Sequence, residues 1–97
     1  MPKYAIVATI KTASGKREEY LNHLRAHGER CRTTEPGTLA FEILVPHEQA
    51  DTLMPYELYT SKEAFDEHWN GASIQQTRKD TAGLLISMSG VRCDHVE

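Results

Sequence analysis

The sequence predicts an α+β domain with the element order β-α-β-β-α-β and an antiparallel sheet. Three features predict it: short alternating segments rich in β-branched residues, one long amphipathic segment after the first of them, and a turn with helix-capping residues after the third. A chain of 97 residues is expected to form one domain, residues 1–97. This order is the split β-α-β pattern of ferredoxin-like folds, which places the helices on one side of the sheet.

The first strand is predicted at residues 4–10, where apolar residues occur at both alternating sets of positions. Apolar side chains on both faces of this strand therefore have to be shielded from water. A Thr-Ala-Ser-Gly turn at residues 12–15 precedes a helix over residues 16–32. One stripe of that helix carries the residues expected to face the core, namely Tyr20, Leu21, Leu24, Gly28 and Cys31.

Glu35-Pro36-Gly37 is expected to end the helix, because a residue before proline avoids the α region and Gly37 can take a positive φ. A second strand is predicted at residues 38–45, where Pro46 ends it. After a polar loop at residues 47–52, a third strand is predicted at residues 53–59. Pro55 favours an edge position or a bulge near the start of this strand.

Residues 60–63 have the spacing of a capping box, in which Thr60 would cap a short helix that ends at Asn70-Gly71. Ser73 is then expected to cap a further helix that continues to Met88 and closes at Gly90. The last strand is predicted at residues 91–96.

The two-sided apolar strands predict a homodimer. One face of the sheet would otherwise form an exposed apolar patch, which soluble monomers rarely tolerate. This face carries either Ala5, Val7, Ala40 and Leu44 or the residues of the same strands that point the other way. The sheet of a second subunit, packed about a two-fold axis, is the simplest cover.

Charge and hydropathy exclude two classes of partner. With 11 basic and 14 acidic residues the formal net charge is −3, so no nucleic acid is expected as a partner. No apolar stretch approaches the ~20 residues needed to span a bilayer, and no signal peptide is recognised. The protein is therefore expected to be soluble and cytoplasmic, with no membrane partner.

No metal or cofactor is expected from the residues. Cys31 and Cys93 lack a C-x-x-C neighbour. Cys31 is interpreted as a small buried apolar side chain, although its arginine neighbours leave a thiolate as the alternative. His23 and His27 have the four-residue spacing of metal ligands on a helix, but they lie at the flank of the apolar stripe and have no third ligand nearby in sequence.

Several segments in order carry a resemblance to a family. Glu35-Pro36-Gly37-Thr38-Leu39 followed by Phe41-Glu42, then residues 56–61 with the sequence Tyr-Glu-Leu-Tyr-Thr-Ser, Ala64-Phe65 and His68, make the chain similar to the antibiotic biosynthesis monooxygenase family. The resemblance covers nearly the whole chain. It implies a dimeric ferredoxin-like α+β barrel.

The resemblance also implies a function. Some members oxygenate quinols or polycyclic phenols without metal or flavin, others are isomerases or haem-degrading enzymes, and many have no known activity. The stretch that commonly reads Ser-Pro-His-Phe is here Gly71-Ala72-Ser73-Ile74, so a second histidine has no counterpart. The asparagine, tryptophan and histidine set of the haem-degrading branch is not recognised either.

The resemblance places His68 as the candidate catalytic base for a phenol or an activated C–H bond. The alternative is a helix-end histidine that binds a backbone carbonyl. Glu57 is the second catalytic candidate, because a carboxylate can orient an imidazole or raise its basicity. A surface glutamate on a strand is its alternative.

Three aromatic residues are candidates for substrate binding. Tyr59 shares a strand face with Glu57, whereas Tyr56 faces the other way, so Tyr59 is the tyrosine expected to contact a ligand. Phe65 and Trp69 could form an aromatic wall, with core packing as the alternative. The expected partners are a small aromatic substrate and molecular oxygen. An isomerase and a non-catalytic small-molecule-binding protein remain the alternative functions.

Overall fold

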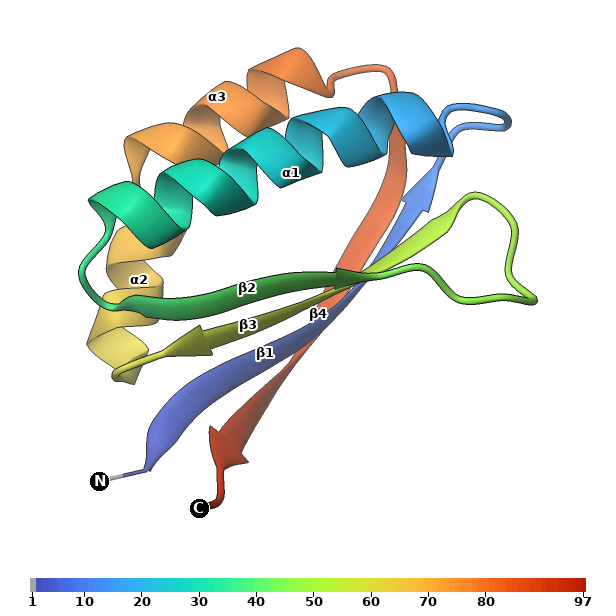
Figure 1. Ribbon diagram of the computed structural model, residues 1–97. Coiled ribbons are helices and arrows are strands. Elements are labelled where there is room, and N and C mark those ends of the chain that lie inside the picture. Colours follow the sequence, from blue (N-terminus) through green and yellow to red (C-terminus); the bar gives the residue numbers. More distant parts are fainter. Residues whose placement is uncertain (1) are drawn as a thin grey trace.

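The computed structural model describes residues 2–97 and confirms the ferredoxin-like α+β fold (Figure 1). Three helices are present, as the individual segments predicted, so that the full order is β-α-β-β-α-α-β, with α2 and α3 together in the place of the second helix of the β-α-β-β-α-β pattern. The elements are β1 (Lys3–Thr12), α1 (Arg17–Thr34), β2 (Thr38–Leu44), β3 (Thr52–Tyr59), α2 (Lys62–Trp69), α3 (Ala72–Asp80) and β4 (Leu85–His95).

The four strands form one antiparallel sheet in the order β2-β3-β1-β4. All three helices cover the same face of this sheet, and α1 and α3 lie side by side across it (Figure 1). The opposite face carries no helix. The core therefore lies between the inner face of the sheet and the helices.

The core follows from the patterns of β1 and α1. Even-numbered residues of β1 from Ile6 to Thr12 are buried, and every residue of the expected α1 stripe is buried. Burying each large aliphatic side chain contributes about 1.5–3 kcal/mol. The largest apolar cluster joins three strands to α1 and the turn before β4, and consists of Ile10, Tyr20, Leu21, Leu24, Phe41, Leu53 and Leu84.

α1 ends at Glu35 as expected, but Gly37 serves a different purpose from the one predicted. Its φ is not positive, since the positive-φ glycines in residues 2–97 are Gly15 and Gly83. A Cβ at Gly37 would instead overlap the Cβ of Ala64 on α2. Glycine is needed here because the chain entering β2 passes directly against α2.

Gly37→Ala is expected to destabilise the protein by about 1–3 kcal/mol, because two backbone-fixed Cβ atoms cannot occupy the same space. Thermal unfolding should show a fall in Tm of roughly 4–8 °C per kcal/mol. The double variant Gly37→Ala/Ala64→Gly should recover part of this loss beyond the sum of the single effects. Strict additivity of the two substitutions would contradict the contact.

The capping residue of α2 differs from the prediction. Ser61 is the N-cap, and its hydroxyl accepts a hydrogen bond from the backbone N–H of Ala64 at 3.1 Å. Thr60 was expected in this role, but its backbone N–H donates to the carbonyl of Gly37. Asn70 ends the helix as expected.

The helix expected between Ser73 and Met88 is much shorter. α3 has Gly71 as its N-cap and ends before Thr81, and Gly83 takes a φ of 88° that no helix accepts. Residues after Gly83 turn back as β4, which pairs along the whole of β1. The three- and four-residue spacing of Leu84, Leu85 and Met88 was therefore misleading, because the free edge of β1 requires a partner strand.

Pro55 was expected at a sheet edge or at a bulge, yet β3 is an inner strand between β2 and β1, and its register with β1 does not shift. The pairing of β3 with β1 explains how proline is accommodated. The register runs to Val7 opposite Tyr56 and resumes at Ile10 opposite Leu53. The missing N–H of Pro55 therefore falls in an interrupted part of the ladder.

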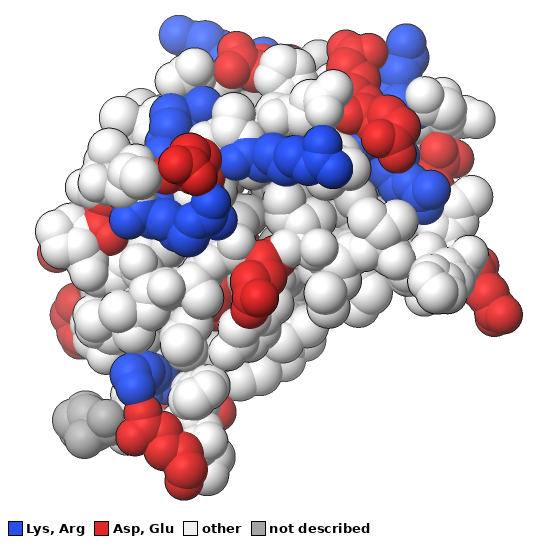
Figure 2. Space-filling model, in the orientation of Figure 1, with Lys and Arg blue, Asp and Glu red and all other residues white. Residues whose placement is uncertain are grey.

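The outer face of the sheet carries exposed apolar side chains. Val7 on β1, which is 40% exposed, lies opposite Val91 on β4, which is 63% exposed. Leu44 on β2 is 57% exposed. Ala5, by contrast, is buried. Charged side chains of both signs are interspersed on the face seen in Figure 2, which shows no continuous basic surface. Within residues 2–97, no helix is long and apolar enough to cross a membrane.

Candidate functional site

A cavity of about 290 Å³ lies between the inner face of the sheet and the helices. A second hollow of about 280 Å³ adjoins it, since Ala8, Glu57, Trp69 and Met88 line both. The wall is mostly apolar, and a small number of polar groups converge on it, as in small-molecule sites. The polar side chains that line the larger cavity include His27, Glu57, His68, Thr77 and Arg78.

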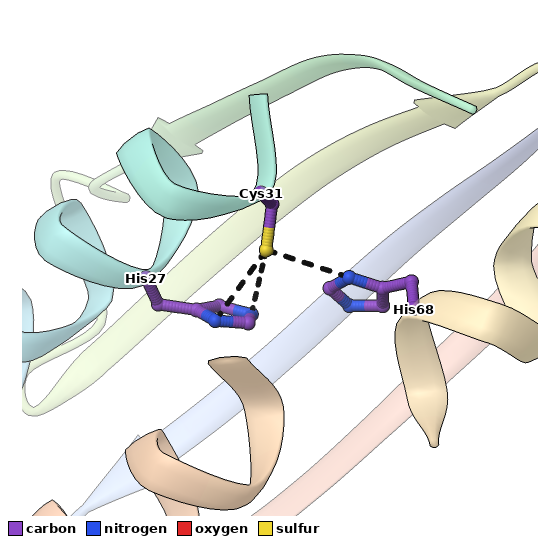
Figure 3. A group of neighbouring side chains, drawn as sticks. All are labelled: His27, Cys31 and His68. Carbon is purple, nitrogen blue, oxygen red and sulfur yellow. Dashed lines mark hydrogen bonds between the residues drawn. The ribbon is translucent and has the colours of Figure 1, made fainter. Parts of the chain in front are cut away.

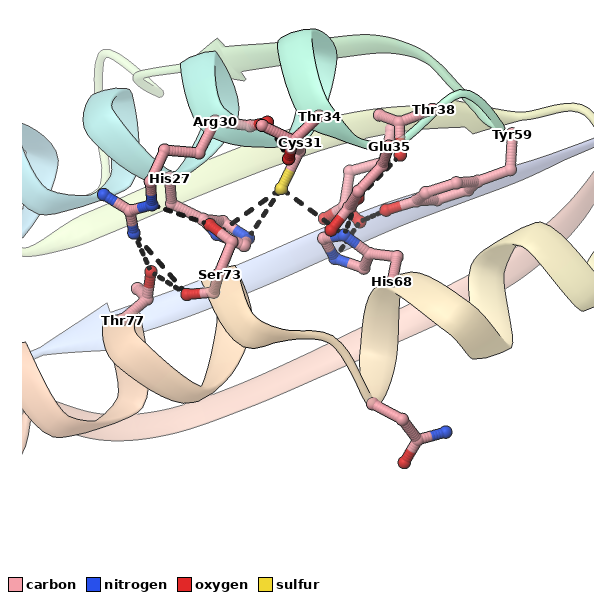
Figure 4. A network of polar contacts seen from close by, with 12 residues as sticks. His27, Arg30, Cys31, Thr34, Glu35, Thr38, Tyr59, His68, Ser73 and Thr77 are labelled. Atoms are coloured by element: carbon pink, nitrogen blue, oxygen red, sulfur yellow. Dashed lines mark hydrogen bonds and ion pairs between the residues drawn. The ribbon is translucent and has the colours of Figure 1, made fainter.

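His68 projects from α2 into this space beside Glu35 (Figure 4), and a second carboxylate from another element lies on the other side of its ring. Its side chain is 2% exposed. Nδ1 lies 2.9 Å from Oε1 of Glu35, and Nε2 lies 3.8 Å from Oε1 of Glu57. The first distance is a hydrogen bond, whereas the second is too long for one.

Glu35 is the partner that orients His68. Burial alone would raise the pKa of the Glu35 carboxyl, but hydrogen bonds from His68 and Thr38 outweigh this effect and hold the pKa below its ordinary value. The Thr38 hydroxyl donates to Oε1 at 2.8 Å. An ionised carboxylate can only accept, so Nδ1 is the nitrogen of His68 that carries the proton in the neutral ring, and Nε2 of that ring has the free lone pair.

Glu57 is buried on β3 and is held by the neighbouring tyrosine. The Tyr59 hydroxyl donates to its Oε1 at 2.5 Å. Burial raises the pKa of Glu57, and the Tyr59 bond and the nearby His68 offset only part of that rise. Burial beside Glu57 likewise raises the pKa of Tyr59. This pair can therefore hold a proton close to His68.

Four of the five candidates from the sequence line the cavities in the structure, and the fifth does not. His68, Glu57, Phe65 and Trp69 all line at least one of the two spaces. Tyr59 is 0% exposed and lines neither. Direct contact between Tyr59 and a ligand is thus not available in this arrangement, because its hydroxyl is bonded to Glu57.

Glu35 was missed by the sequence analysis, which interpreted it only as part of a helix stop. It lies 33 positions from His68 in the chain, so no local spacing connects the two. The carboxylate reaches the imidazole because α1 ends beside α2. The prediction instead assigned the orienting role to Glu57, whose carboxylate lies farther from the ring.

His27 is fully buried and is held by a polar network between α1 and α3 (Figure 4). Its Nδ1 is 2.8 Å from the Ser73 hydroxyl, which also accepts from Nε of Arg30 at 2.9 Å. Arg30 donates further to the Thr77 hydroxyl at 3.0 Å. Ser73, expected as a helix cap, therefore joins α3 to α1 through its side chain.

Stability is expected to fall as the pH drops below 6.5, because His27 is buried in its neutral form. Burial, followed by His68 and Arg30, lowers the pKa of His27 from 6.5 to about 4, against an opposing effect of Glu35. The unfolded chain then binds more protons between these two values, so stability is full above 6.5 and is lost toward 4. The loss from this residue is about 2 kcal/mol between pH 7.5 and pH 5.

Urea denaturation at these two pH values checks this expectation, with His27→Asn as the variant and His23→Asn, which lies on the same helix, as the control. His27→Asn should flatten the pH dependence, whereas His23→Asn should retain it. An unchanged slope in His27→Asn would contradict the assignment.

His27, Cys31 and His68 form the cluster of possible metal ligands within residues 2–97 (Figure 3). The Cys31 sulfur lies 3.5 Å from Nδ1 of His68, but it is almost equidistant from the two nitrogens of His27, at 3.5 and 3.7 Å. An imidazole lone pair lies in the ring plane and points away from the other nitrogen, so the sulfur lies near neither lone-pair axis. A tetrahedral ion would require the His27 ring to turn away from Ser73.

The Cys31 thiol matches the apolar interpretation of the sequence. Its side chain is 0% exposed. Burial, reinforced by Glu35, raises the pKa of Cys31 to about 12. The sulfur is therefore a neutral thiol packed among the imidazoles, and the thiolate alternative does not hold.

A ferredoxin-like sheet covered on one face, with a cavity under the helices and a buried histidine between two carboxylates, defines the chain as a small α+β domain with a candidate small-molecule site. The chain belongs to the antibiotic biosynthesis monooxygenase family, whose model matches residues 3–80. No curated protein matches it in sequence.

Solved structures share the fold at low identity. A Pseudomonas aeruginosa protein is 20% identical and superposes with a TM-score of 0.89, over 100% of this chain and 97% of that one. A candidate antibiotic biosynthesis monooxygenase from Caulobacter crescentus is 20% identical, with a TM-score of 0.92 over 99% of this chain and 92% of that one. At such identity these likenesses show the fold alone.

Proposed function

We propose that this protein is a cofactor-independent monooxygenase that oxidises a quinol or a polycyclic phenol with molecular oxygen. The observation that carries the proposal is the position of His68. It lies on the cavity wall, its Nδ1 is bonded to Glu35, and its Nε2 is free to take a proton. This is the arrangement of a positioned general base.

In this scheme Nε2 of His68 removes a proton from the substrate, and Glu35 stabilises the imidazolium that results. The substrate anion then passes electrons to oxygen within the cavity. For a quinol, C₆H₆O₂ + O₂ gives the hydroxyquinone C₆H₄O₃ + H₂O, and for the ring methylene in the keto form of a polycyclic phenol, CH₂ + O₂ gives C=O + H₂O. In both cases the four electrons that the substrate loses reduce the oxygen completely. No external reductant is needed, because the substrate supplies all the electrons.

The mostly apolar walls support this chemistry in two ways. They keep water away from the anion, and they hold the aromatic substrate against oxygen. Phe65 and Trp69 stack with ring centroids 6.0 Å apart and both line the adjoining hollow, and Trp69 also lines the larger cavity, which suits a flat substrate. Glu57 and Tyr59 hold a further proton close to the reacting atoms.

The test is oxygen uptake by purified, metal-free protein with a panel of quinols and anthrones. Uptake above background, with one oxygen consumed per quinone formed, is the expected result. A product formed without oxygen would identify an isomerase that uses the same base. Tight binding without any product would identify a non-catalytic binding protein, and either outcome overturns the monooxygenase assignment.

Glu35→Gln is expected to lower kcat by about 10- to 100-fold and to leave KM nearly unchanged. The amide cannot stabilise the imidazolium, and Glu35 lines neither cavity. Because the carboxylate of Glu35 is ionised at neutral pH, the variant should also alter the acidic limb of the pH–rate profile. Steady-state kinetics with Glu42→Gln, an exposed glutamate of β2, provides the control. Equal kcat in the two variants would exclude the role of Glu35.

A further inference from the structure

Two arginine side chains stand over the aromatic residues that border the cavities. The guanidinium carbon of Arg78 on α3 lies 4.5 Å from the ring centroid of Trp69, and that of Arg92 on β4 lies 5.4 Å from the centroid of Phe65. Arg78 lines the larger cavity and Arg92 lines the adjoining one. Each cavity thus has a cation fixed on its aromatic side.

Neither arginine is neutralised by the fold. Among residues 2–97, the guanidinium groups of Arg78 and Arg92 have no ion pair and no hydrogen bond to another side chain or to a carbonyl. Arg32, an exposed arginine of α1, forms by contrast an ion pair with Glu29. A guanidinium above an aromatic ring keeps the N–H donors that point away from the ring free for a planar anion.

We infer that the cavity binds a planar aromatic hydroxy acid, whose carboxylate pairs with the guanidinium of Arg78 while the hydroxyl end points toward His68. This inference deepens the proposed function and rests on it for the role of His68. Arg92 adds a second positive charge at the adjoining opening. A carboxylate can meet the N–H edge of Arg78 in two parallel hydrogen bonds, the geometry that arginine favours.

The distribution of polar groups on the wall gives the ligand its direction. The Nε2 lone pair of His68 suits a hydroxyl group, whereas Arg78 suits an anion. Burial of Glu57 favours its neutral form, which limits repulsion of a negatively charged ligand. Stacking on Trp69 also holds Arg78 in place before binding, so that less side-chain entropy is lost in the complex.

The test compares 6-hydroxy-2-naphthoate with its neutral analogue 6-hydroxy-2-naphthamide by isothermal titration calorimetry under anaerobic conditions. The acid should bind about tenfold or more tightly than the amide, and its affinity should fall as salt is raised. Trp69 is the sole tryptophan of the sequence, so its indole N–H resonance in an NMR spectrum reports whether the ligand occupies this cavity.

Three variants complete the test. Arg78→Gln should remove most of the preference for the acid, and Arg92→Gln should reduce it less. Arg25→Gln, an exposed arginine of α1 that lines neither cavity, should leave it unchanged. Both cavity arginines are exposed, and far-UV circular dichroism with thermal melts should show that these variants fold normally.

Equal affinity for acid and amide, no binding of either compound, or an unchanged preference in Arg78→Gln would overturn the inference. These outcomes are distinct from failure of the proposed function, because binding is measured without turnover. If the acid binds in a manner that depends on Arg78 but no substrate supports oxygen uptake, this inference holds. The monooxygenase assignment is then wrong.

Discussion

Replacing His68 by glutamine is expected to lower the rate of oxygen uptake by about 10²- to 10⁴-fold. The amide fills a similar volume but cannot take a proton at neutral pH, so the substrate anion no longer forms at a useful rate. The loss should fall on kcat, since the cavity walls stay in place. An oxygen electrode, combined with analysis of the quinone product, measures it.

The matched control is His47→Gln, because His47 is an exposed histidine of the loop between β2 and β3. It should retain full activity. Circular dichroism must show that His68→Gln is folded, because the substitution leaves the Glu35 carboxylate without its imidazole partner. A folded His68→Gln protein with the kcat of the unaltered protein would eliminate His68 as the base and with it the proposed mechanism.

Val91→Glu is expected to convert a dimer into monomers and to raise the dimer dissociation constant on the order of 100-fold or more. Val91 and Val7 lie opposite each other on the outer face of the sheet, where no helix covers them. In a two-fold contact between two sheets the variant would bury two unpaired carboxylates, each of which costs a few kcal/mol.

Sedimentation velocity over a range of concentrations measures this effect. Val96→Glu is the control, because Val96 follows the end of β4 and is already 87% exposed. It should leave the association unchanged. If the unaltered protein sediments as a monomer at all concentrations, the sheet-to-sheet dimer is wrong. If both variants stay dimeric, the contact lies elsewhere.

Local patterns in the sequence predicted most of the fold. Alternation in residues 4–10 and the stripe of α1 correspond to the buried faces of β1 and α1 in the structure. The helix stop at Glu35 and the boundary at Asn70 were also correct. These signals succeed because strand alternation, helix periodicity and chain-terminating residues act over a few neighbouring positions.

The errors occurred where a long-range contact decided the outcome. Leu85 and Met88 fitted a helical spacing, but they pair with the edge of β1 as part of β4. Pro55 resembled an edge residue, but an interruption in the pairing with β1 allows it inside the sheet. Gly37 was predicted to have a positive φ, whereas the close contact with Ala64 is the reason that glycine is required.

By itself, the sequence determined the α+β fold, the family resemblance, and the choice of His68 and Glu57 as titratable candidates on the inner side. Only the tertiary structure decided which groups meet. It brought Glu35 to His68, put Tyr59 behind Glu57, and set Arg78 over Trp69 beside the cavity. Residue types and local spacing determine which face of an element is buried, but the distance between two side chains on different elements depends on how those elements pack.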